Sequence, residues 1–147
     1  MPCAHRPYTR RGTGHWCRGY DWGPIRDTDP RYSVSTTHSS RGYGYRNCTD
    51  YVAWRLQKRG IPLAMFTGLG DGGDWAKAAA ARGIVVNARP AVGSAAVQPG
   101  EPGHVAYVDS VRGATITVSE YNKKGDGTYD TRTGNARALG FARFVHF

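Results

Sequence analysis

The chain has 147 residues, of which 39% are hydrophobic and 21% are charged. This length is typical of a single domain with one hydrophobic core, and no stretch approaches the roughly 18 apolar residues of a membrane span. The net charge of +9 comes from arginines spread along the chain. It predicts attraction to a polyanion without deciding among nucleic acid, anionic lipid and wall polymer. A merely soluble basic surface is the alternative.

The first 40 residues show no helical or strand period, because Gly, Pro, Arg, Thr and Ser alternate with single aromatic residues. We interpret them as an irregular arm that packs onto the domain through its aromatic side chains. A binding surface is the alternative. The first eleven residues lack the apolar segment of a signal peptide. An exported form would therefore need a signal removed beforehand or another export route.

The chain has three cysteines, and two of them lie in the arm. A disulfide between Cys3 and Cys17 would close a loop of about 15 residues and contribute on the order of 3 kcal/mol. A zinc site formed with His5 and His15 is the alternative, although the spacing matches no common zinc module. Either interpretation leaves Cys48 with a free thiol.

The clearest helix pattern covers residues 47–60, where Asn47 is a good N-cap and Val52 and Leu56 recur four residues apart. A second, alanine-rich helix is expected over 74–82. The strands expected after it are 84–86, 95–97, 104–110, 114–121 and 141–146. Because helices precede strands, the sequence predicts an α+β domain with N-terminal helices packed on a mainly antiparallel sheet.

Cys48 takes the first position of the predicted helix, where free N–H groups and the helix dipole stabilise a thiolate. A buried cysteine that packs as a small apolar residue is the alternative. A thiol nucleophile needs an imidazole base, and the imidazole needs an acceptor that orients it. Of the five histidines, His104 is the best candidate, because it begins a strand directly after Gly103.

The two strands that follow Gly103 form a predicted hairpin whose register depends on its turn. A two-residue turn at 112–113 mixes apolar and polar residues on each face, whereas a three-residue loop at 111–113 separates them. The three-residue loop gathers apolar residues on one face, namely Ala106, Val108, Ile116 and Val118. It also puts His104 directly opposite Glu120 and diagonal to Asn122. Either Glu120 or Asn122 could accept a hydrogen bond from the ring N–H of His104. The alternative is that His104 and Glu120 form an ordinary cross-strand pair at the surface.

Six segments form a pattern in the chain, namely YRNCTDYVAWR (45–55), DW (74–75), PAVGSAAV (90–97), GHVAYV (103–108), ITVSEYN (116–122) and FVHF (144–147). In order and spacing they resemble the CHAP domains, the cysteine, histidine-dependent amidohydrolases/peptidases. The resemblance covers about residues 41–147. It implies a papain-like fold whose catalytic set is Cys48, His104 and Glu120, with Asn122 as a fourth polar residue.

The resemblance implies a catalytic domain over 41–147, preceded by the arm at 1–40. Family members typically cleave amide bonds in peptidoglycan, as N-acetylmuramoyl-L-alanine amidases or peptide endopeptidases, through a cysteine acyl-enzyme. Tyr45 and Asn47 are candidate substrate-binding residues. Many relatives carry Gly-Gln directly before the cysteine, whereas this chain has Arg-Asn. The backbone N–H of Cys48 is therefore the safer oxyanion donor.

Some phage members of the family bind calcium through acidic residues shortly before the cysteine. Asp27 and Asp29 lie too far upstream to match them, so we expect no metal and no other cofactor. The expected partner is bacterial peptidoglycan, with anionic wall polymers as a further candidate. We expect a monomer without nucleic-acid or membrane partners, secreted to the extracellular space or cell wall. One alternative is an inactive wall-binding module. The other is a basic nucleic-acid-binding domain, although the sequence contains no recognisable helix for reading bases.

Overall fold

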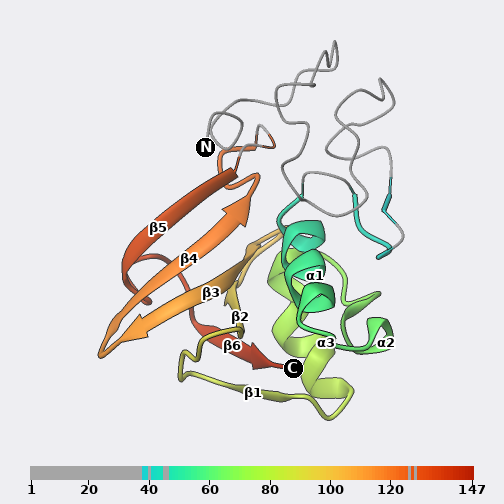
Figure 1. The fold of residues 1–147 in the computed structure, drawn as a ribbon, viewed down its shortest axis with the longest axis horizontal. Coiled ribbons are helices and arrows are strands. Elements are labelled where there is room, and N and C mark those ends of the chain that lie inside the picture. Colours follow the sequence, from blue (N-terminus) through green and yellow to red (C-terminus); the bar gives the residue numbers. More distant parts are fainter. Residues whose placement is uncertain (1–37, 40, 45–46, 126, 128) are drawn as a thin grey trace.

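A six-stranded sheet with helices on one side forms the framework of the protein (Figure 1). This computed structural model describes residues 38–39, 41–44, 47–125, 127 and 129–147. The elements are α1 (Cys48–Lys58), α2 (Leu63–Phe66), η2 (Gly72–Asp74), α3 (Trp75–Ala81), β1 (Val85–Asn87), β2 (Ala95–Gln98), β3 (His104–Arg112), β4 (Thr115–Tyr121), β5 (Tyr129–Asn135) and β6 (Arg143–His146). No helix in this described part is long and apolar enough to cross a membrane.

The strand order is β1-β6-β2-β3-β4-β5, and every neighbouring pair is antiparallel. The α+β class with a mainly antiparallel sheet is therefore confirmed. In Figure 1 the helices lie beside β2, β3 and β6, while β4 and β5 extend away from them. Hydrophobic residues on both faces of the sheet are buried, in one cluster beneath the helices and a second on the opposite face.

Helix α1 packs onto the sheet because its apolar residues recur on one face. Val52 and Leu56 are fully buried, and they belong to the same cluster as Val105 and Tyr107 of β3. Burial of side chains of this size stabilises the fold by roughly 1.5–3 kcal/mol each. This packing fixes the start of α1 relative to the start of β3.

The predicted helices occur within two residues of their expected bounds, and the five expected strands are all present. Strand β5 was not predicted, because its sequence Tyr-Asp-Thr-Arg-Thr-Gly-Asn carries a single large apolar residue. The short helices α2 and η2 were also missed. Asn47 is the N-cap residue of α1, as expected, but its side chain makes no capping hydrogen bond.

The turn between β3 and β4 differs from the predicted three-residue loop. Arg112 pairs with Thr115, so only residues 113–114 lie in the turn, and the pairing then shifts by one residue between Val108 and Ser110. The predicted loop and register were therefore wrong. A bulge adds one unpaired residue to a strand, and alternation of apolar residues does not reveal whether the extra residue lies in the turn or in the strand.

Because of this bulge, His104 and Glu120 lie on one face of the sheet, as predicted, although their pairing differs from the predicted one. Beyond the bulge Val108 pairs with Val118, and the same register puts Ala106 opposite Glu120. His104 is therefore diagonal to Glu120 rather than directly opposite it, which corrects the predicted pairing. Both side chains still lie on the same face of the sheet, because the bulge shifts the register by one residue in β3 alone.

Candidate active site

Cys48 begins α1 and is partly exposed. The preceding Asn47 has an extended backbone, with φ −81° and ψ 156°, and turns the chain into the helix. At this position the first N–H groups of an eleven-residue helix have no partner within the helix. Their partial positive charge is concentrated at the start of the helix, where Cys48 lies.

His104 begins β3 and is 5% exposed. Its Nε2 atom lies 2.7 Å from Oε2 of Glu120, which is fully buried. Cys48 lies near enough to His104 to influence its protonation, and both residues line the same cleft. Since Nε2 is engaged by the carboxylate, Nδ1 is the ring nitrogen left for the thiol. The structure therefore brings the predicted cysteine, histidine and acidic residue together at one site.

The two ionisable partners shift each other's pKa in the direction of a charged pair. Burial lowers the pKa of His104, but its hydrogen bonds with Cys48 and Glu120 outweigh burial and raise that pKa above 6.5. Burial alone would raise the pKa of Glu120, yet the hydrogen bonds from His104 and Arg132 leave it lowered. The site therefore favours an ionised Glu120 beside an imidazole that holds its proton well.

Arg132 contacts Glu120 and was missed by sequence reasoning, because it lies on β5. Its Nε donates to Oε1 of Glu120, and its Nη2 donates to Oε2 at 3.0 Å. The one available signal was the alternation of Tyr129, Thr131 and Thr133, which are residue types typical of strands. Even a correct strand assignment would not have indicated which residue its arginine contacts.

A cleft of about 330 Å³ opens over Cys48 and His104. Its lining residues are Asn47, Cys48, Thr49, Asp71, Gly72, Gln98, Pro102, Gly103, His104, Asn122, Lys123 and Gly125. On one side Lys123 Nζ donates to Oε1 of Gln98 at 2.8 Å. The cleft is accessible to a ligand, and both the thiol and the imidazole belong to its lining.

Two glycines allow the segment before α3 to lie against the start of β3. A Cβ atom on Gly72 would come within 2.8 Å of the carbonyl carbon of His104, and one on Gly103 within 2.5 Å of Cα of Gly73. Gly103 also has a φ of +65°, a conformation that other residues rarely adopt. This close approach sets the position from which the His104 side chain enters the cleft.

The other predicted site residues are Asn122, Tyr45 and Asn47. Asn122 lines the cleft, but its Nδ2 donates to Oδ1 of Asn47 at 3.0 Å and its Oδ1 accepts the N–H of Gly127 at 2.8 Å. Glu120, not Asn122, is therefore the acceptor found at the imidazole. Tyr45 lies outside the described residues. The substrate-binding roles of Tyr45 and Asn47 stay predictions.

No metal site emerges among the residues that the structure describes, since no three His, Cys, Asp or Glu side chains gather there as ligands. The alternative disulfide and zinc arrangements of Cys3 and Cys17 lie outside the described residues. Residues 1–37 of the predicted arm (1–40) lie there too, so the role of the arm and the division at residue 40 stay predictions.

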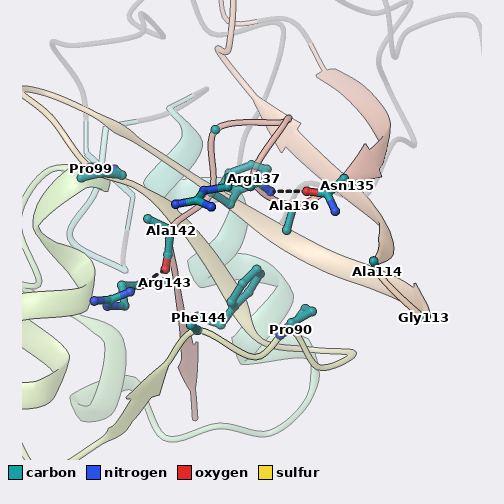
Figure 2. Close-up of a pocket in the computed structure, with 13 residues that line it drawn as sticks. Pro90, Pro99, Gly113, Ala114, Asn135, Ala136, Arg137, Ala142, Arg143 and Phe144 are labelled. Carbon is teal, nitrogen blue, oxygen red and sulfur yellow. Dashed lines mark hydrogen bonds between the residues drawn. The ribbon is translucent and has the colours of Figure 1, made fainter.

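A larger cavity of about 500 Å³ shares no lining residue with this cleft. Figure 2 shows Arg137, Arg143 and Phe144 among the side chains around it. Its lining residues, all within the described part, include no Cys, His, Asp or Glu. The cavity therefore has no nucleophile and no proton-transfer group, and the smaller cleft is the candidate active site.

Comparison with known proteins assigns a family to this arrangement. The sequence model of the CHAP domain matches residues 37–122, which include Cys48, His104 and Glu120. The chain is 34% identical over 126 residues to "Probable autolysin SsaALP" of Staphylococcus aureus, covering 84% of this chain and 47% of that protein. It is 34% identical over 119 residues to "Staphylococcal secretory antigen SsaA" of the same species, covering 78% and 45%.

A solved structure supports the fold. The crystal structure of an N-acetylmuramoyl-L-alanine amidase from Staphylococcus aureus superposes with a TM-score of 0.63 at 28% sequence identity. The match covers 84% of this chain and 37% of the amidase chain. The chain thus spans about half the length of the curated relatives it matches, and a smaller share of the amidase.

Proposed function

This chain belongs to the CHAP domain family, and from that premise we propose that it is a peptidoglycan hydrolase that cleaves an amide bond of the bacterial cell wall. The observation that carries the proposal is that Cys48 and His104 line one accessible cleft, and that the imidazole of His104 lies 2.7 Å from the buried carboxylate of Glu120. A thiol, a base and an orienting carboxylate are the groups that acyl transfer requires.

The reaction begins with proton transfer from Sγ of Cys48 to Nδ1 of His104. The thiolate attacks the amide carbonyl carbon, and the resulting oxyanion accepts a hydrogen bond from the backbone N–H of Cys48. The intermediate collapses as the C–N bond breaks and His104 protonates the leaving amine. Water, deprotonated by His104, then releases the acyl group and restores the thiol.

Glu120 supports both proton transfers through its contact with Nε2 of His104. The carboxylate fixes the tautomer in which Nδ1 faces the thiol, and it stabilises the imidazolium that forms when the proton arrives. It is buried and therefore shielded from water. Asn47 and Asn122 line the same cleft and are proposed to contact the substrate.

The expected bond is either the amide between N-acetylmuramic acid and L-alanine or a bond within the peptide stem or cross-bridge. Relatives are named an amidase, an autolysin and a secretory antigen, and these names support action in the extracellular space or the cell wall. No cofactor enters the proposed reaction, and a single chain supplies all of its groups.

The test uses purified peptidoglycan. The chain should release new amino groups, and Cys48→Ala and His104→Ala should each abolish that release. Mass spectrometry of the products identifies the bond, because an amidase frees the N-terminus of L-alanine whereas an endopeptidase frees a stem or bridge residue. Retained hydrolysis by both variants would contradict the assignment. Sedimentation of the chain with walls without hydrolysis would instead indicate a wall-binding module.

A further inference from the structure

Arg132 lies on the edge strand β5 and engages both carboxylate oxygens of Glu120. Oε2 of Glu120 accepts two hydrogen bonds, from Arg132 Nη2 at 3.0 Å and from His104 Nε2 at 2.7 Å. Oε1 accepts the third, from Arg132 Nε. Glu120 therefore connects His104 to Arg132, a residue beyond the three predicted members of the site.

The guanidinium of Arg132 is itself held in place. Its Nη1 donates to the carbonyl oxygen of Leu139 at 3.1 Å, and its Cζ lies 5.3 Å from the centroid of the Phe141 ring. All three of its nitrogens are thus hydrogen-bonded, and its side chain is only 22% exposed. A lysine has a single ammonium and cannot reproduce this planar two-point contact.

Glu120 needs such a partner because it is fully buried. Burial favours the neutral form of a carboxyl group, and a neutral Glu120 would no longer stabilise an imidazolium on His104. Two charged groups in the described part of the chain do not replace Arg132. Asp130 is paired with Glu120 across the sheet and carries the same charge, while Lys123 is bonded to Gln98 at the cleft.

We propose that Arg132 is a positioning residue for the reaction: it keeps Glu120 ionised and oriented, so that the imidazole of His104 presents Nδ1 to the Cys48 thiol. Arg132 does not line the cleft and so acts through Glu120. The inference builds on the proposed function, but the state of the Cys48–His104 pair can be measured without any cell-wall substrate.

The experiment compares Arg132→Gln and Arg132→Lys in the full chain. Arg137→Gln is the matched control, because Arg137 is an exposed arginine outside the cleft and its loss changes the net charge equally. Iodoacetamide alkylation of Cys48 is followed against pH, with mass spectrometry of the peptide that contains Cys48, so that Cys3 and Cys17 do not contribute.

In Arg132→Gln, Glu120 should take up a proton at higher pH, and the acid limb of Cys48 alkylation should move up by about one pH unit, as expected for losing a charge-assisted contact. Arg132→Lys should restore part of this shift, because it keeps the charge. Arg137→Gln should match the unmodified chain. An Arg132→Gln profile that superposes on that of Arg137→Gln would overturn the proposal.

Cell-wall hydrolysis gives the second readout. Arg132→Gln should lower kcat about tenfold with KM little changed, whereas Arg137→Gln should leave both unchanged. If the unmodified chain does not hydrolyse walls, the proposed function fails, while the alkylation profile still decides the role of Arg132. If Arg132→Gln does not fold, as judged by circular dichroism, Arg132→Lys carries the same comparison, and an unshifted Lys profile then counts against the proposal.

Discussion

Arg41 and Asp50 form a buried, two-point ion pair at the start of the helix that carries the nucleophile. Arg41 Nε lies 2.9 Å from Oδ1 of Asp50 and Nη2 lies 3.0 Å from Oδ2, and both side chains are at most 1% exposed. Ser39 Oγ also donates to Oδ1. Because Asp50 follows Cys48 by two residues, this pair ties the first turn of α1 to the segment before it.

We expect Arg41→Met to destabilise the protein by about 3–5 kcal/mol, because it leaves the Asp50 carboxylate buried without its partner. Urea denaturation followed by circular dichroism measures the change. Arg89→Met is the control, since Arg89 is exposed, and it should stay within about 0.5 kcal/mol of the unmodified chain. Equal effects of the two substitutions would contradict the importance of the pair.

Glu120→Gln should move the alkaline limb of the kcat/KM profile to lower pH. Hydrogen bonds and charge from Cys48 and Glu120 raise the pKa of His104 against burial, so removing the carboxylate lowers it, by about one unit. Activity requires one proton shared by Cys48 and His104, and that proton is then lost at lower pH. A pH series of cell-wall hydrolysis measures the limb, and an unmoved limb would contradict the coupling.

The same raised pKa of His104 predicts how stability depends on pH. A histidine whose pKa is higher in the folded state stabilises the fold fully below its unfolded value, near 6.5, and loses this contribution as pH rises through the folded value. The free energy of unfolding should therefore fall over this range, and it should fall less in Glu120→Gln. Denaturation curves at several pH values measure both.

Gly103→Ala should be more damaging than Gly113→Ala, although both glycines have a positive φ. A Cβ on Gly113 meets nothing within 4 Å, whereas one on Gly103 would lie 2.5 Å from Cα of Gly73. The control, Gly113→Ala, should lower the free energy of unfolding by about 1–2 kcal/mol through backbone conformation alone. Gly103→Ala should lower it by about 1–3 kcal/mol more through overpacking. Thermal unfolding and wall hydrolysis measure both effects, and similar losses would show that the close approach is not needed.

Asn47 and Asn122 should be energetically coupled. Asn122 Nδ2 donates to Asn47 Oδ1 at 3.0 Å, which joins the N-cap of α1 to the residue after β4. A double-mutant cycle with Asn47→Ala and Asn122→Ala should give a coupling of about 0.5–1.5 kcal/mol in unfolding free energy. Because Asn122 has a φ of +62°, Asn122→Gly separates the lost hydrogen bond from backbone strain. Additive single effects would contradict the coupling.

The helix at Cys48 and the strand at His104 were predictable because their signals are local. An N-cap residue, a four-residue apolar recurrence and short apolar runs depend on neighbours within a few positions. The pairing of β3 with β4 was predicted on the correct face but in the wrong register, since the bulge between Val108 and Ser110 has no local signature.

By itself, the sequence determined the α+β class, the helix that presents Cys48 and the strand that presents His104, and it put Glu120 on the same face of the sheet as that histidine. Only the tertiary structure decided that Glu120 rather than Asn122 accepts a hydrogen bond from the imidazole, and that Arg132 donates hydrogen bonds to Glu120. The physical reason is distance along the chain. Periodicity sets which face of the sheet a side chain occupies. A contact between two strands also depends on turns, bulges and edge strands, which form only when the whole sheet assembles.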